Sequence, residues 1–68
     1  MTLTAILTQA SDGGYVAYNP ETGTTTQGDT IEGSLFNLRE ATELYLEEFP
    51  EKCSRTPALM TTFELEYA

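Results

Sequence analysis

Carboxylates are the only side chains of this chain that are numerous enough to build acid–base or metal chemistry. Glu64 and Glu66 lie two residues apart, so in an extended strand they share one face. A two-metal nuclease would need further acids that converge on them from neighbouring elements. Residues 1–9, MTLTAILTQ, contain no acid, so the central member of such a cluster is missing. We interpret the two glutamates as a solvated strand face and expect no metal site.

Other residue types that catalysis needs are nearly absent. The sequence has no histidine and one cysteine, Cys53, so neither a serine–histidine nor a cysteine–histidine pair can be assembled. It contains no glycine-rich phosphate loop and no zinc-type cysteine spacing. We expect no catalytic residue, no cofactor and no enzymatic activity. A degenerate nuclease, the rival hypothesis, predicts binding of Mg²⁺ or Mn²⁺.

The charge of the chain is strongly one-sided. Eleven acidic residues stand against three basic ones, which gives a net charge of −8. Such a surface repels phosphate backbones, so we expect no direct nucleic-acid partner. It would attract a basic protein and speed the encounter between the two. Taken alone, the charge is explained at least as well by its general effect of keeping a small protein soluble.

The length of the chain limits its stability. Its 68 residues form a single domain, residues 1–68, and a core of this size is worth only roughly 3–5 kcal/mol. Oligomerisation or docking adds stability, so we expect a homo-oligomer. The N-terminus lacks a signal-peptide pattern, and no segment approaches the roughly 20 apolar residues of a membrane span. With its single thiol, the chain is expected to be cytoplasmic and to have no membrane partner.

Hydrophobic periodicity predicts four strands and one helix. The strands are expected within residues 2–8, 15–18, 24–27 and 58–67, and the helix at residues 31–49. Turn signals lie at residues 11–14 and 19–23. The resulting order is β-β-β-α-β, an α+β fold in which an antiparallel three-stranded meander precedes a helical crossover. The crossover would bring the fourth strand parallel to the first, in the spatial order 3-2-1-4.

The junction between the third strand and the helix contains Gly28, Asp29 and Thr30. Gly28 ends the strand, and either Asp29 or Thr30 is expected to cap the helix. If Asp29 is the cap, Glu32 falls at the third helical position and completes a capping box. If Thr30 is the cap, no box forms. In both cases Asp29 and Glu32 lie near the positive end of the helix dipole.

A series of short motifs runs in a fixed order through residues 13–48. They are a Tyr-x-Ala strand, a proline turn, Gly-Asp-Thr, and a helix with Asn-x-x-Glu-Ala and a Leu-Tyr-Leu-like ending. The matching residues are Tyr15, Ala17, Pro20, Gly28, Asp29, Thr30, Asn37, Glu40, Ala41, Tyr45 and Leu46. In this order and spacing, the segment resembles the HicB antitoxin domain. The resemblance implies a partial, degenerate ribonuclease-H-like fold without nuclease activity.

The resemblance also implies a partner and a set of contact residues. In the HicB family this domain neutralises HicA, a small basic toxin that cleaves RNA, by docking on it and masking its catalytic histidine. Carried over position by position, the resemblance gives the partner-contact candidates Tyr18, Pro20, Glu21, Asp29 and Glu32. The alternative is a stand-alone homo-oligomeric adaptor or regulatory domain of the same fold, without a toxin partner, that pairs through an exposed strand.

The sequence departs from the HicB pattern at three places. Thr22 and Thr24 replace the usual second proline and the cysteine of the turn, and Gly33 replaces a glutamate at the helix start. Full antitoxins of the family often carry a C-terminal DNA-binding domain, whereas this sequence ends at Tyr67-Ala68. We therefore do not expect this chain to regulate an operator by itself.

Overall fold

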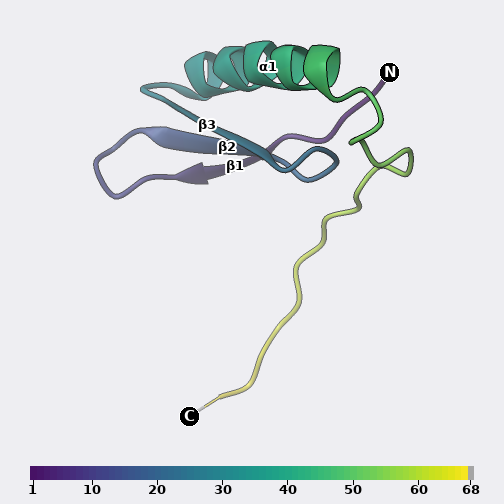
Figure 1. Cartoon of the computed structure of the whole chain (residues 1–68). Coiled ribbons are helices and arrows are strands. Elements are labelled where there is room, and N and C mark those ends of the chain that lie inside the picture. The colour runs from purple at the N-terminus through teal and green to yellow at the C-terminus, as the bar shows by residue number, and fades with distance from the viewer. Residues whose placement is uncertain (68) are drawn as a thin grey trace.

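A three-stranded antiparallel sheet and one helix make up the folded body. The computed structural model describes residues 1–67 and contains β1 (Ile6–Gln9), β2 (Tyr15–Asn19), β3 (Thr24–Gly28) and α1 (Ile31–Glu48). The strands lie in the order β1-β2-β3, and α1 lies across one face of the sheet (Figure 1). The other face of the sheet carries no further element of the described chain. The predicted meander and helix are thus confirmed.

Two tight turns join the strands, and each contains a glycine in the left-handed region. Gly13 has a φ of 95° in the β1–β2 connection, and Gly23 has a φ of 81° between β2 and β3. The first turn is braced by Asp12, whose Oδ1 accepts a hydrogen bond from the backbone N–H of Gly14 at 3.0 Å. Glycine adopts positive φ without a steric penalty, which is why both turn signals located the connections correctly.

The helix cap is Thr30. Its Oγ1 accepts a hydrogen bond from the backbone N–H of Gly33 at 2.9 Å, so Asp29 lies before the cap and no capping box forms. The helix ends at Glu48, one residue before the predicted end, and Pro50 follows. The choice that the sequence left open between the two caps is therefore settled in favour of the threonine.

Small residues let the helix lie very close to the sheet. A Cβ atom added to Gly28 would lie 2.5 Å from the backbone nitrogen of Ser34, which is itself fully buried. Two hydrogen bonds cross the same contact: Thr26 Oγ1 donates to the Ser34 carbonyl at 3.0 Å, and Asn37 Nδ2 donates to the Gln27 carbonyl at 2.8 Å. Gly28 is therefore required by the close approach of two backbones.

The hydrophobic core is thin. Within residues 1–67, the buried apolar side chains are Ala17 of β2 and Leu38 of α1. Burial of Ala17 identifies the helix-facing side of the sheet, and its neighbours Val16 and Tyr18 therefore point to the uncovered side. Leu44 of α1 is exposed. So small a core agrees with the low stability expected of a chain of this length.

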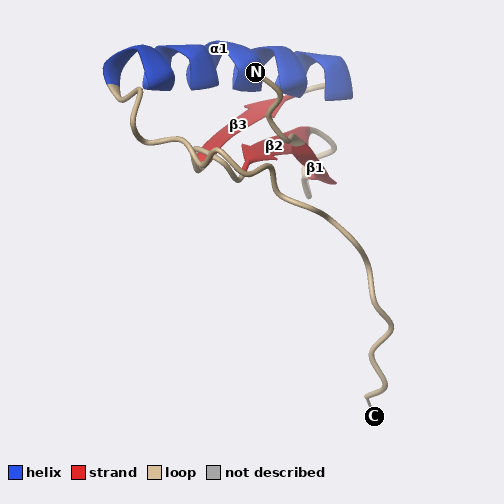
Figure 2. Cartoon of the chain, turned by 90° about the vertical axis from the view of Figure 1, so that its right-hand side faces the viewer, coloured by secondary structure: helices blue, strands red, loops and turns tan. Residues whose placement is uncertain are grey.

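The predicted fourth strand is wrong. Residues 58–67 have no secondary structure, and beyond Ala58 they are all exposed and lead away from the folded body (Figures 1 and 2). β1 is consequently an edge strand, and the observed order of three strands replaces the predicted 3-2-1-4. β1 is also shorter than predicted, because it starts at Ile6 and not at residue 2. Alternation indicates that a segment can pair as a strand, but it does not identify the partner.

Candidate functional site

The predicted contact residues fall into two groups at opposite ends of the sheet. Tyr18, Pro20 and Glu21 lie at or next to the turn between β2 and β3, whereas Asp29 and Glu32 lie where β3 passes into α1. β3 separates the two groups by five residues, which corresponds to about 16 Å in an extended strand. The structure therefore does not join them into a single site, and contact with a partner remains a prediction for all five.

Glu21 is the centre of a buried polar cluster at the turn. Its Oε1 accepts hydrogen bonds from the Thr4 backbone N–H and from Asn19 Nδ2, both at 2.7 Å. Its Oε2 accepts from Thr4 Oγ1 at 2.7 Å and from the Ala58 backbone N–H at 2.8 Å. The Glu21 carbonyl also accepts from the Ser54 N–H at 3.0 Å. One residue thus connects the segment before β1, the β2–β3 turn and the segment after α1.

These hydrogen bonds stabilise the ionised carboxylate. The backbone N–H of Ala58, followed by that of Thr4, lowers the pKa of Glu21 from 4.5 to about 2, while burial opposes the shift. The carboxylate therefore stays charged at neutral pH with its oxygens already occupied. Glu21 is engaged within its own chain, which leaves it little capacity to bind a partner in this conformation.

Asn19 completes the same cluster. Its Nδ2 also donates to the Thr4 carbonyl at 2.7 Å, and its Oδ1 accepts from the Thr22 backbone N–H at 2.9 Å. Sequence reasoning missed this role, because the partners of Asn19 and Glu21 lie up to 37 residues away along the chain. Asparagine beside a turn proline was the only local signal, and it predicts a turn and not a buried cluster.

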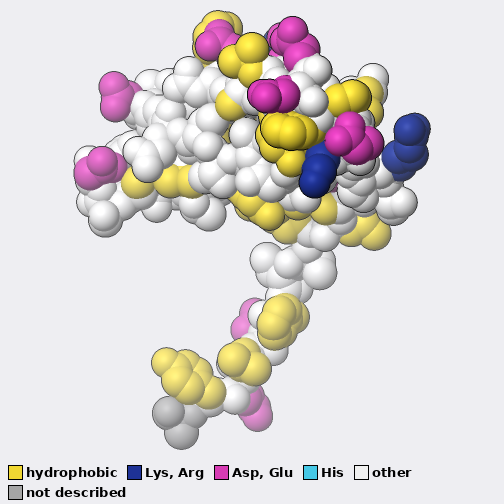
Figure 3. Space-filling view, viewed as in Figure 1, with side chains coloured by type: hydrophobic (Ala, Val, Ile, Leu, Met, Phe, Trp, Pro, Cys, Tyr) yellow, Lys and Arg dark blue, Asp and Glu magenta, His cyan; other side chains and the backbone are white. Residues whose placement is uncertain are grey.

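The opposite end of the sheet forms an acidic corner, which we define as Asp12, Asp29 and Glu32. All three side chains are exposed. Asp12 and Asp29 line a shallow depression of about 250 Å³ whose other wall includes Tyr15. Asp12 was not among the predicted contact residues, although its Asp-Gly turn placed it next to the start of β2. Acidic side chains also gather over α1 and at this end of the molecule in Figure 3.

The acids of the helix form a second, separate surface. Glu40, Glu43 and Glu47 are exposed and lie three or four residues apart on α1. Like charges at this spacing destabilise a helix by about 0.2–0.5 kcal/mol for each pair. The exposed surface of α1 therefore carries more negative charge than is favourable for the stability of the helix itself.

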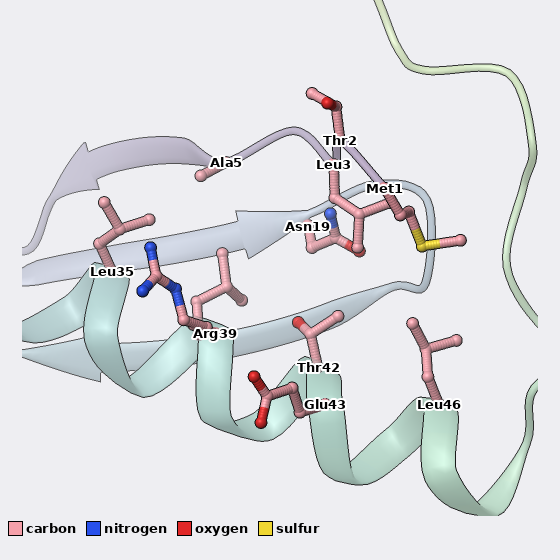
Figure 4. Close-up of a pocket in the computed structure, with 11 residues that line it drawn as sticks. Met1, Thr2, Leu3, Ala5, Asn19, Leu35, Arg39, Thr42, Glu43 and Leu46 are labelled. Atoms are coloured by element: carbon pink, nitrogen blue, oxygen red, sulfur yellow. The ribbon is translucent and has the colours of Figure 1, made fainter.

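A groove of about 540 Å³ runs between the segment before β1 and the helix (Figure 4). Leu3 and Ala5 line one side, and Leu35 and Leu46 line the helix side. Thr42 also faces the groove, and its buried hydroxyl has no hydrogen-bond partner within residues 1–67. No motif in the sequence indicates this groove, because it forms between the N-terminal segment and a helix more than 25 residues further along the chain.

Catalytic or metal-binding geometry is not found at any of these places. Within residues 1–67, no group of three or more cysteine, aspartate or glutamate side chains is placed to hold a metal ion. Glu64 and Glu66 belong to residues 58–67, the extended segment that leads away from the folded body. Over the same residues, α1 is too polar to cross a bilayer. The absence of enzymatic activity stays a prediction.

Comparison with known proteins gives one partial similarity of note. A UPF0150 protein of Synechocystis sp. is 47% identical to this chain over 45 residues. The match covers 65% of this chain and 57% of that protein, so this chain spans little more than half of the relative's length. The name of the relative states no activity. No family model and no solved structure matches the chain.

Proposed function

We propose that this chain is an antitoxin-like binding protein that neutralises a small basic HicA-type RNA-cleaving toxin by covering its active site. The motif order of residues 13–48 supports the proposal, as does the net charge of −8. The observation that carries it is the acidic corner, three exposed carboxylates contributed by the β1–β2 turn and by the junction between β3 and α1. Such a surface attracts a basic protein and orients it during the encounter.

The acidic corner has room for one basic side chain. Asp12 and Asp29 border a depression of about 250 Å³, and Tyr15 supplies an aromatic wall. An arginine or lysine of the partner could place its charged group between the carboxylates and its aliphatic stem against the ring. Tyr18 is 40% exposed and lies on the face of the sheet opposite α1. It offers a partner an aromatic contact on that face.

The proposal is tested by mixing the purified chain with a purified HicA-type toxin. We expect RNA cleavage by that protein to stop at a one-to-one ratio, and we expect association to slow as salt is raised. Cleavage that continues unchanged in a saturating excess of this chain would refute the proposal.

A matched pair of variants tests the acidic corner itself. Asp29→Asn with Glu32→Gln removes two charges from the corner, and we expect the association rate at low salt to fall by about tenfold. Glu64→Gln with Glu66→Gln removes two charges from the extended C-terminal segment, so the net charge changes equally in both. Equal slowing of association by both variants would show that net charge alone matters and that the corner is not the contact surface.

One observation favours the second candidate function, a homo-oligomeric adaptor or regulatory domain without a toxin partner. β1 pairs with β2 along one edge, and no strand within residues 1–67 pairs with its other edge. Exposed strand edges are templates for association with another chain. If no basic ribonuclease binds this chain and a stable oligomer forms, this second function is supported instead.

A further inference from the structure

We infer that the outer face of α1 binds a basic amphipathic helix of another protein. Apolar side chains of that helix would contact Phe36 and Leu44, and its lysines or arginines would pair with the glutamates between and beside them. We use the name outer row for the residues at every fourth position along this face, which are Glu32, Phe36, Glu40, Leu44 and Glu48. The inference rests on α1 alone, so it stands whether or not the acidic corner contacts a toxin.

The outer row lies on the side of α1 that faces away from the sheet. The helix has three buried residues, which are Ser34, Leu38 and Thr42. Phe36, Glu40 and Leu44 each follow one of these by two residues, which corresponds to about 200° around the helix axis. Within residues 1–67, no other element covers this side of the helix (Figures 1 and 2). The row is therefore open to a partner.

Two large apolar side chains of the outer row are exposed to water. Phe36 is 64% exposed and Leu44 is 60% exposed. They lie two turns apart, which is about 12 Å along the helix axis. Contacts at this spacing suit a second helix, because its positions seven or eight residues apart return to the same face after two turns. A strand is not suited to this face, because the backbone groups of a helix are hydrogen-bonded to one another.

Glutamates separate the two apolar side chains and flank them. Glu40 lies one turn from each, and Glu43 and Glu47 are exposed beside the row. The last turn of α1 contains no basic residue. Figure 3 shows acidic side chains next to hydrophobic ones over α1. The repulsion between these glutamates opposes helix formation in the free chain, and lysine or arginine side chains of a partner would relieve it.

The charge of this face determines the kind of partner. A second copy of the chain would bring glutamates against glutamates, and an anionic membrane or a nucleic acid would be repelled in the same way. An apolar helix without basic residues would remove water from the glutamates without pairing them. A helix with apolar and basic side chains in one row matches both features. Rows at every fourth position also interdigitate in the commonest geometry of helix packing.

A synthetic peptide tests whether the chain binds a partner of this chemistry. The peptide has about 18 residues, with leucine at every third or fourth position and lysine at the others. We expect calorimetric titration to show binding that weakens as salt is raised. A peptide of the same composition without helical periodicity should bind about tenfold more weakly or less. If the intact chain binds neither peptide, or binds both equally, the inference is overturned.

Two pairs of alanine variants in the full chain locate the contact. Phe36→Ala with Leu44→Ala removes the apolar contacts, and we expect the dissociation constant of the periodic peptide to rise by about tenfold or more. Leu59→Ala with Phe63→Ala removes the same residue types from the extended C-terminal segment, and we expect no change. Both pairs keep the net charge, and alanine favours the helix, so α1 should keep its circular dichroism signal. Equal weakening by both pairs, or no weakening by the first, overturns the inference.

A second set of variants tests the charged part of the contact. Glu40→Gln with Glu47→Gln removes two charges beside the apolar contacts, whereas Glu64→Gln with Glu66→Gln removes two charges from the C-terminal segment. We expect the first pair to weaken peptide binding at low salt by about tenfold and the second pair to weaken it much less. An equal effect of both pairs would mean that the peptide responds only to net charge, and would overturn the inference. None of these variants changes the acidic corner, so failure here leaves the toxin-neutralising proposal untouched.

Discussion

Replacement of Gly28 by alanine should remove most of the stability of this protein. The new Cβ would lie 2.5 Å from the backbone nitrogen of Ser34 and 2.8 Å from its Cα. Both are helix backbone atoms, so no side chain can rotate away to make room. Ordinary van der Waals contact begins at 3.4 Å. The start of α1 must therefore withdraw from β3 by about 0.9 Å, the difference between 3.4 and 2.5 Å.

The cost of that withdrawal can be set against the stability of the whole domain. Overpacking of this kind costs about 1–3 kcal/mol, and stretching the Thr26–Ser34 and Asn37–Gln27 hydrogen bonds costs about 1 kcal/mol each. The sum, about 3 kcal/mol or more, is comparable with the roughly 3–5 kcal/mol that a domain of this size possesses. We therefore expect the urea midpoint, followed by far-ultraviolet circular dichroism, to fall by more than half.

Gly33→Ala is the matched control. The added Cβ there would meet only the Thr30 hydroxyl, at 3.1 Å, and alanine at a helical position gains about 1 kcal/mol over glycine. We expect its urea midpoint to stay the same or to rise. If Gly28→Ala unfolds at the same urea concentration as the parent, the close contact between β3 and α1 does not exist and the reasoning fails.

Two further predictions concern buried polar groups. Because the pKa of Glu21 is lowered to about 2, its carboxylate stabilises the fold above pH 4.5, and this contribution is lost as the pH falls from 4.5 towards 2. In Glu21→Gln an amide NH₂ replaces one accepting oxygen and faces two hydrogen-bond donors. The melting temperature should therefore be lower at neutral pH and should depend less on pH in the acid range. The control variant Glu64→Gln should melt like the parent. Thr42→Val removes a buried hydroxyl without a partner and should leave the melting temperature unchanged or raise it; a clear decrease would show that the hydroxyl is hydrogen-bonded in solution.

Local sequence signals were sufficient for the turns, the three strands and the helix. Gly13 and Gly23 marked turns because positive φ is a property of a single residue, and Pro50 placed the end of α1 within two residues. The cap was narrowed to two residues and assigned only by the structure, since Asp29 and Thr30 have similar chemistry. The same local alternation misled us at residues 58–67, where pairing depends on a surface that sequence periodicity does not describe.

The candidate site was less predictable than the fold. Tyr18, Asp29 and Glu32 are exposed, as a contact surface requires, but Glu21 is buried and hydrogen-bonded within the chain. Its role depends on Thr4 and Ala58, which lie 17 and 37 residues away, and no motif spans such separations. The proximity of Asp12 to Asp29 likewise depends on the pairing of Tyr15 with Gly28 across the sheet.

The backbone N–H groups of Thr4 and Ala58 both donate to the Glu21 carboxylate. This shared contact fixes where additional polypeptide would leave the folded body. Both strand-flanking segments reach the sheet at its Asn19 end, whereas Asp29 lies beyond the opposite end of β3. A tag, linker or fused module that leaves the body at either of these segments would start at the Asn19 end of the sheet, which is the end opposite the acidic corner. The flanking segments and the proposed contact surface thus lie at opposite ends of the sheet, and fluorescent labels for binding studies can be attached at Cys53 without crowding the acidic corner.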